Sequence, residues 1–267
     1  MTTQAWENPV KAALKQGRPV VAATVTSNSV DSAAQLASMG FDFLWIEMEH
    51  SPVTLETLRH IVLATRGAKA VPFARVPVNE IWTAKRVLDA GVHGVIFPFT
   101  STPELAAQAV AACRYPPHGR RGSGAGLARF AWPPVEDYYD AADQHVMVIV
   151  IIEEARAVEN VDAIAATPGV DAMFIGTSDL SFSLGLRGRQ NEAAQHDAIR
   201  KVVEAGKRHN KILGRPAGSP EQVQQFMEQG FLLFQAPTDL GFMAAGAKRY
   251  LEPLEKSRRE SEPRALY

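Results

Sequence analysis

The chain has 267 residues, of which 46% are hydrophobic and 21% are charged, and its formal net charge is -1. This length and composition suit one large α/β domain and exclude a disordered chain. A near-zero net charge offers no electrostatic footprint for nucleic acid or an anionic membrane, so we expect a small molecule as the partner. The single cysteine, Cys113, excludes an internal disulfide and a cysteine-based zinc site, and it fits a reducing compartment.

No targeting or membrane segment is expected. The first residues, MTTQAWE, contain neither the basic region nor the apolar stretch of a signal peptide. The longest unbroken apolar run, residues 146–152, is far shorter than the roughly 20 residues that cross a bilayer. We therefore expect a cytoplasmic protein with one domain over residues 1–267 and a charged C-terminal tail from about residue 251 to residue 267.

Eight short apolar runs are predicted strands, and segments of helical period separate them. The runs are 20–25, 43–46, 71–74, 94–97, 146–152, 172–175, 212–214 and 232–235. The predicted helices are 32–39, 54–65, 81–90, 103–112, 155–166, 197–208 and 220–229. Near-continuous apolar strands that alternate with amphipathic helices indicate a parallel sheet, and eight such units favour a closed (β/α)8 TIM barrel.

Turn residues support these boundaries, and one connection is unusually long. Four glycines lie between a helical segment and a strand, where a left-handed helix C-cap is expected: Gly40, Gly91, Gly169 and Gly230. The Ser-Pro pairs at 51–52 and 219–220 are predicted helix starts. The Pro/Gly/Arg-rich segment 114–140 is predicted to be a functional loop, because long loops inside compact domains usually carry function.

Polar residues follow several strands at their carboxyl ends, where the active site of such a barrel lies. They include Glu47, Glu49, His50, Arg75, Glu153, Asp179 and Arg215. Glu153 and Asp179 form the natural metal pair, since two carboxylates with waters and a chelating substrate suit Mg²⁺, Mn²⁺ or Co²⁺. The alternative is that each acid is a helix N-terminal carboxylate or a salt-bridge partner.

Three side chains and one turn have further candidate roles. His50 is a candidate base, because an imidazole titrates near neutrality; alternatively it only neighbours a helix N-cap. Asp89 lies at a helix C-terminus, where an acid opposes the macrodipole, so it should have a partner, and His50 is one candidate. Arg75 ends an apolar strand and should face an anion. The backbone of Gly176-Thr177-Ser178 precedes a helix and could hold a carboxylate, although short turns of this kind are common.

Together these residues give the chain a resemblance to the HpcH/HpaI aldolase family of metal-dependent class II pyruvate aldolases. The resemblance extends from about residue 14 to residue 251. It is carried, in the family's order, by GFDFLWIEMEHSP (40–52), FARVPVNE (73–80), LDAGVHGVIFP (88–98), RYPPHGRRGSG (114–124), VIIEEARAVENVDAI (150–164) and GVDAMFIGTSDLSFSLG (169–185).

The resemblance implies a fold, an assembly and a reaction. The fold is a (β/α)8 barrel, and the assembly is a homo-hexamer of dimers that exchange their last helix. The reaction is reversible aldol cleavage of 4-hydroxy-2-oxo acids to pyruvate, or a close 2-oxo acid, and an aldehyde.

The resemblance also implies residue roles. A divalent metal binds Glu153 and Asp179. His50 is the base, paired with Asp89, and Arg75 faces the keto oxygen of pyruvate. Gly176 and Ser178 offer N–H groups to its carboxylate, with Thr177 between them. The mouth is lined by residues 115–133 and Arg215, with a neighbouring subunit as one source of these residues.

The sequence departs from the family pattern at several positions. Glu47 replaces an aspartate beside the base, and Ile151 replaces a glutamine that would add a polar group near pyruvate. Thr177-Ser178 replaces Pro-Ala before the metal aspartate. The seventh predicted strand, 212–214, is followed by Arg215. We hypothesise that this arginine favours an acidic acceptor aldehyde. Ile151 and Arg215 therefore leave donor and acceptor preference open.

Other readings remain. The same metal-enolate chemistry would also serve oxaloacetate decarboxylation or a malyl-type C–C lyase. A Schiff-base aldolase is disfavoured, because Lys69 and Lys211 flank strands and do not lie within them. A non-enzymatic barrel that binds a keto acid would be expected to lose the metal pair or the base, and the chain keeps both.

Overall fold

The computed structural model describes residues 6–261, and the side chains of residues 6–254. Eight parallel strands form a closed barrel in the order β1-β2-β3-β4-β5-β6-β7-β8. They are β1 (Val20–Val25), β2 (Phe43–Glu47), β3 (Val71–Arg75), β4 (Gly94–Phe97), β5 (Met147–Ile152), β6 (Ala172–Ile175), β7 (Ile212–Pro216) and β8 (Leu233–Thr238). The predicted (β/α)8 fold is confirmed.

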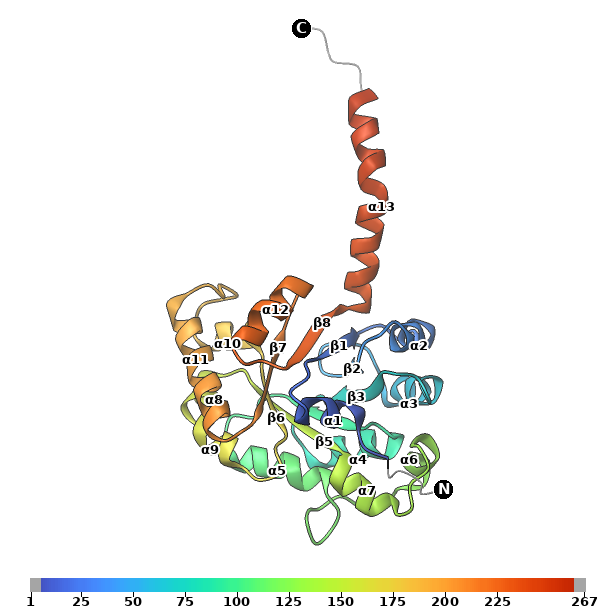
Figure 1. Cartoon of the computed structure of the whole chain (residues 1–267), viewed down its shortest axis with the longest axis vertical. Helices are drawn as coiled ribbons and strands as arrows, with labels where there is room; N and C mark the ends of the chain where they lie inside the picture. Colours follow the sequence, from blue (N-terminus) through green and yellow to red (C-terminus); the bar gives the residue numbers. More distant parts are fainter. Residues whose placement is uncertain (1–5, 262–267) are drawn as a thin grey trace.

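Helices follow the strands and surround the barrel (Figure 1). They are α1 (Pro9–Lys15), α2 (Val30–Ser38), α3 (Leu55–Ala64), α4 (Ile81–Ala90), α5 (Pro103–Cys113), α6 (Gly126–Ala131), α7 (Tyr138–His145), α8 (Ala155–Glu159), α9 (Val161–Ala166), α10 (Thr177–Ser183), α11 (Ala193–Arg208), α12 (Pro220–Glu228) and α13 (Asp239–Ser261). The four glycines predicted as left-handed caps have φ between 85° and 109°.

Two helix boundaries differ from the sequence prediction. The first helix after β2 begins at Leu55 with Thr54 as its N-cap, so the Ser-Pro pair at 51–52 does not start it. The hydroxyl of Ser51 instead closes a turn, because it donates to the Glu47 carbonyl and accepts from the Val53 N–H. The predicted helix 155–166 is two helices that meet at Asn160, whose amide donates to the Ser101 carbonyl over 2.9 Å. The Ser219 cap of α12 is as predicted.

Alternate residues of each strand face the barrel interior. The inward set forms one apolar cluster that includes Val20, Ala22, Phe43, Trp45, Phe73, Ile96, Ile149, Ile151, Phe174 and Leu233. Residues between them face outward and pack with the helices in a second, larger cluster. This alternation decides which side chains can reach the mouth of the barrel.

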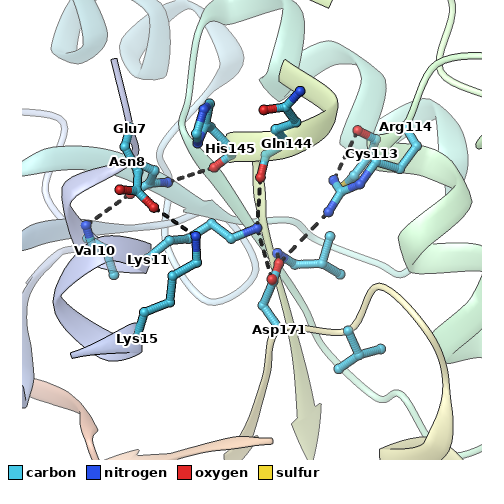
Figure 2. Close-up of polar contacts among 12 residues, drawn as sticks. Glu7, Asn8, Val10, Lys11, Lys15, Cys113, Arg114, Gln144, His145 and Asp171 are labelled. Carbon is cyan, nitrogen blue, oxygen red and sulfur yellow. Dashed lines mark hydrogen bonds and ion pairs between the residues drawn. The ribbon is translucent and has the colours of Figure 1, made fainter. Parts of the chain in front are cut away.

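Helix α1 closes the amino end of the barrel. Asn8 caps α1 and donates to the carbonyls of His93 and His145, just before β4 and β5. Lys11 forms an ion pair with Asp171 over 2.9 Å and donates to the carbonyl of Gln144 (Figure 2). These contacts tie the first helix to the starts of three strands, so the open end of the barrel is the carboxyl end.

The excursion 114–140 lies toward the amino end of the barrel, because it follows helix α5 rather than a strand. It is also partly helical, since it contains α6 and the start of α7. The prediction of a loop is therefore corrected to a partly helical segment, and its functional role stays a prediction. Within one chain this segment does not line the mouth, so any contribution there must come from a second chain.

Helix α13 extends away from the barrel instead of packing beside it (Figure 1). The predicted tail from residue 251 is helical as far as Ser261, and residues 262–267 lie outside the described residues. Its exposed apolar side chains are Leu240, Phe242, Met243, Tyr250, Leu251 and Leu254. Among the described helices, none is long and apolar enough to cross a membrane.

Candidate active site

Arg75 lies at the carboxyl end of β3 between two carboxylates. Its Nε donates to Oε2 of Glu47 over 2.5 Å, and its Nη1 lies 3.0 Å from Oε2 of Glu49. The Arg75 side chain is only 13% exposed. Burying a guanidinium is costly unless carboxylates compensate it. The two acids therefore fix this cation at the mouth of the barrel, as the sequence predicts for a residue that must face an anion.

Glu47 organises the turn that carries Glu49 and His50. Its Oε1 accepts the N–H of Glu49 over 2.7 Å and of His50 over 3.0 Å, and its Oε2 also accepts from Nε1 of Trp45. One buried carboxylate thus orients Arg75 and the strand end together. Glu47 and Glu49, which the sequence places at a strand end, therefore both lie beside Arg75.

Glu153 is almost wholly buried, at 1% exposure, just after β5. Its Oε1 accepts the backbone N–H of Phe99 over 2.7 Å. The pKa of Glu153 is raised to about 7, mainly by burial; the charges of Glu49 and Asp179 contribute to this rise, while the Phe99 N–H and Arg75 oppose it. A cation at this carboxylate would offset that burial.

Phe99 was not found by sequence reasoning. Its φ is +47°, which is unusual for a bulky residue, and this conformation accompanies an N–H that points at Glu153. The residue follows β4 with no polar side chain to mark it. A contribution made through the backbone leaves almost no signal in the sequence.

Gly176 contacts Glu153 so closely that a side chain would not fit. A Cβ at residue 176 would lie 2.6 Å from Oε2 of Glu153 and 3.1 Å from Cγ2 of Ile151. The Gly176 N–H donates to the Ile152 carbonyl over 3.2 Å, so its predicted role as a free donor to a carboxylate is corrected. Helix α10 has no side-chain cap, which leaves the N–H groups of Thr177 and Ser178 as the better donors.

Glu153 and Asp179 suit a divalent cation. Oε1 of Glu153 is occupied by the Phe99 N–H, while its Oε2 faces Gly176, where no side chain blocks approach. Asp179 lies in the first turn of α10, near enough to influence the titration of Glu153. Among the described residues, no group of three or more His, Cys, Asp or Glu side chains is arranged to hold a metal. A cation here would therefore rely on two carboxylates plus water and substrate, as hard cations allow.

His50 and Asp89 are not brought together within one chain. His50 is at the rim, with its side chain 59% exposed and its Nε2 3.7 Å from Oε1 of Glu49. Asp89 lies in the last turn of α4, which runs antiparallel to the strands and so ends toward the amino end of the barrel. Its carboxylate lies 3.4 Å from Nη2 of Arg121. A pair between His50 and Asp89 would need two chains.

Arg215 does not face the interior of the barrel. Gly214 is the inward residue there, since a Cβ on it would meet Phe174 and Leu233. Arg215 therefore points outward, and its guanidinium lies 3.6 Å from the centre of the Phe226 ring on α12. The hypothesis that Arg215 selects the acceptor aldehyde is corrected, because the strand turns this side chain away from the mouth.

Comparison with known proteins decides the family. The model of the HpcH/HpaI aldolase/citrate lyase family matches residues 24–245. The chain belongs to this family. It is 33% identical over 256 residues to the 5-keto-4-deoxy-D-glucarate aldolase of Enterobacter sp. (strain 638), covering 96% of this chain and 100% of that protein. The corresponding aldolase of Salmonella arizonae is 36% identical over 221 residues, covering 83% and 86%.

One solved structure agrees with this assignment, and a more distant one shares the fold. An HpcH/HpaI aldolase/citrate lyase family protein from Burkholderia cenocepacia J2315 superposes with a TM-score of 0.86 at 33% identity, covering 93% of this chain and 99% of that one. A citrate lyase β subunit from M. tuberculosis, solved with oxaloacetate and magnesium, shares the fold at 14% identity and a TM-score of 0.54. The protein is an aldolase, that is, a carbon–carbon lyase, in a family of metal-dependent aldolases and lyases.

Proposed function

We propose that the protein catalyses reversible cleavage of 4-hydroxy-2-oxo acids to pyruvate, or a close 2-oxo acid, and an aldehyde. The observation that carries the proposal is the cluster of Glu153, Asp179 and Arg75 at the carboxyl ends of the strands. The aldolases of Enterobacter and Salmonella named above make 5-keto-4-deoxy-D-glucarate the first substrate to test.

The roles follow from position and charge. A divalent cation on Glu153 and Asp179 would supply Lewis-acid stabilisation of the enolate that forms when the C3–C4 bond breaks. Arg75, held rigidly by Glu47 and Glu49, adds positive charge where the keto oxygen becomes negative. The N–H groups of Thr177 and Ser178 hold the substrate carboxylate. His50, exposed at the rim, accepts the proton of the C4 hydroxyl during cleavage, and the enolate then takes up a proton from water at C3 to give pyruvate. Both proton transfers run in reverse during addition.

The reaction in this proposal uses an assembly of several chains. Asp89 of one chain orients His50 of another, because the two residues lie toward opposite ends of a single barrel. Exchange of α13 between chains, within a homo-hexamer, accounts for a helix that stands free with six large apolar side chains exposed. A helix usually packs against the barrel after the eighth strand, and α13 of a second copy would fill that position.

A retro-aldol screen tests the function. The full chain is stripped with EDTA, reloaded with Mg²⁺, Mn²⁺ or Co²⁺, and assayed for pyruvate and aldehyde release from 4-hydroxy-2-oxo acids. We expect both products in equal amounts only when metal is restored. If the protein releases pyruvate from oxaloacetate and releases no aldehyde from any other substrate in the panel, it is instead a decarboxylase. Activity that survives EDTA, together with covalent trapping of pyruvate on the protein by borohydride, would point to Schiff-base chemistry.

A further inference from the structure

A groove of about 930 Å³ lies between α11 and α12, outside the barrel wall at β7. Its floor includes Arg215 at the end of β7 and Thr177 at the start of α10. Helix α12 has no fully buried residue, so this side of the barrel is thinly covered. The groove is separate from the mouth of the barrel, because Arg215 faces outward from the strand.

Arg215 carries a positive charge that nothing in the described part of the chain neutralises. Its guanidinium stacks 3.6 Å from the Phe226 ring centre and 5.3 Å from that of Phe231. Its Nε is buried without a hydrogen-bond partner, and none of its atoms lies within ion-pair distance of a described carboxylate. Burial lowers the pKa of Arg215 to about 10. Stacking leaves the edge of a guanidinium available to an oxyanion, which it binds in a planar, bidentate way.

The side-chain oxygen of a buried amide in the same groove also lacks a hydrogen-bond partner. Gln195 is wholly buried; its Nε2 donates to the Thr177 carbonyl over 2.8 Å, while its Oε1 has no partner. An unsatisfied buried acceptor costs free energy, which a hydroxyl donor would recover.

The groove walls are cationic and rich in amides. Lys207 lines the groove, and its one lining acid, Glu204, is paired with Arg200 over 3.3 Å. Five more amide side chains line it: Gln190, Asn191, Gln222, Gln225 and Gln229. Amides donate and accept hydrogen bonds, which suits a ligand with several hydroxyl groups.

We propose that this groove binds a small polyhydroxylated oxyanion, with Arg215 holding the anionic group and Oε1 of Gln195 accepting from a hydroxyl. The Gln195–Thr177 hydrogen bond links the groove to the turn of Thr177 and Ser178. The binding site itself stands independently of the proposed function.

Calorimetric titration of the metal-loaded full chain tests binding. The probes are an aldarate, a hexose phosphate, inorganic phosphate and a neutral hexitol, and titrations are repeated in Glu153→Gln so that binding at the barrel mouth is not counted. We expect the aldarate or the hexose phosphate to bind more tightly than inorganic phosphate and the hexitol. Whichever of the first two binds identifies the oxyanion as carboxylate or phosphate.

Variants locate the binding. Arg215→Met keeps the packing on Phe226 and should weaken binding by about tenfold or more, the usual loss for one charged hydrogen bond. Arg215→Lys is better able to keep the fold, and its affinity for the probe should lie between those of Arg215→Met and the natural chain. Arg208→Gln is the matched control, since Arg208 is paired with Asp162 and does not line the groove, and should change binding little.

Three results would overturn the proposal. One is that no probe binds, and another is that Arg215→Met binds as tightly as the natural chain. The third is burial of the groove against a second copy, read from a Gln225→Cys variant that maleimide fails to label in the assembled protein. The native Cys113 is buried and does not confuse that readout.

Discussion

At the scale of single residues, the close contact between Gly176 and Glu153 predicts a sharp effect of one added methyl group. In Gly176→Ala the new Cβ would lie 2.6 Å from Oε2 of Glu153, so the carboxylate must move. We expect Mn²⁺ affinity, measured by calorimetry, and kcat both to fall by about tenfold or more. Gly126→Ala is the control, because a Cβ there meets nothing within 4 Å. Unchanged Mn²⁺ binding in Gly176→Ala would show that Glu153 is not a ligand.

Glu47 offers a second test at this scale. Glu47→Gln removes one of the two charges that hold Arg75, and losing one member of a buried ion pair costs about 3 kcal/mol or more. We expect a lower free energy of unfolding in urea together with a kcat about tenfold lower. Asp162→Asn breaks the Arg208 pair, whose members are 57% and 61% exposed, and should leave both quantities unchanged. Equal effects from the two variants would contradict the buried-pair argument.

The sequence indicated which residue types end the strands, yet not always where they point. The positions of Arg75 and Glu153 were predictable, because a charged residue at the end of a buried apolar strand must lie at the carboxyl end of the barrel. Arg215 was misassigned although the signal was present: Gly214 is inward, so the next side chain is outward. Phe99 was beyond reach, since its contribution is a backbone N–H in an uncommon conformation.

At the scale of elements, strands were predicted better than connections. The eight apolar runs differ from the observed strands by at most three residues at either end, because burial on both faces leaves little choice of residue. The excursion 114–140 was the main error. Its Pro and Gly content hid two helices, and its position after a helix, rather than after a strand, already assigned it to the amino end.

The turn between α4 and β4 contains a buried histidine, His93, which predicts a pH effect on stability. His93 packs between Trp6 and Trp132, at ring-centre distances of 5.0 and 4.7 Å, with no partner for either ring nitrogen. Burial lowers the pKa of His93 from 6.5 to about 3. Below pH 6.5 the unfolded chain takes up a proton that the folded chain refuses, so stability falls as pH drops toward 3, by at most about 1.4 kcal/mol per pH unit.

Urea unfolding at several pH values checks this effect. His93→Phe removes the histidine whose protonation destabilises the natural chain at low pH. As pH falls from 6.5 to 4, the free energy of unfolding should therefore decrease less in His93→Phe than in the natural chain. His60→Gln on the exposed face of α3 should run parallel to the natural chain. A constant difference between His93→Phe and the natural chain across this range would contradict the prediction.

At the scale of the whole molecule, α13 predicts the assembly. Tyr250 and Leu251 are 77% and 44% exposed on a helix that leaves the barrel, and an apolar face of this kind normally has a partner. The double change Tyr250→Asp and Leu251→Asp should reduce the mass found by analytical ultracentrifugation, because charges cannot be buried against a second copy. Lys201→Glu on the outer face of α11 serves as a charge control. An unchanged mass would exclude exchange of this helix.

The placement of His50 and Asp89 toward opposite ends of one barrel has a genetic consequence. If each base is oriented by its neighbour's acid, a chain carrying His50→Ala and a chain carrying Asp89→Asn are each inactive alone. When they assemble together, about a quarter of the sites unite an intact histidine with an intact aspartate. Two defective alleles in one cell would then complement each other, so heterozygosity would conceal both lesions.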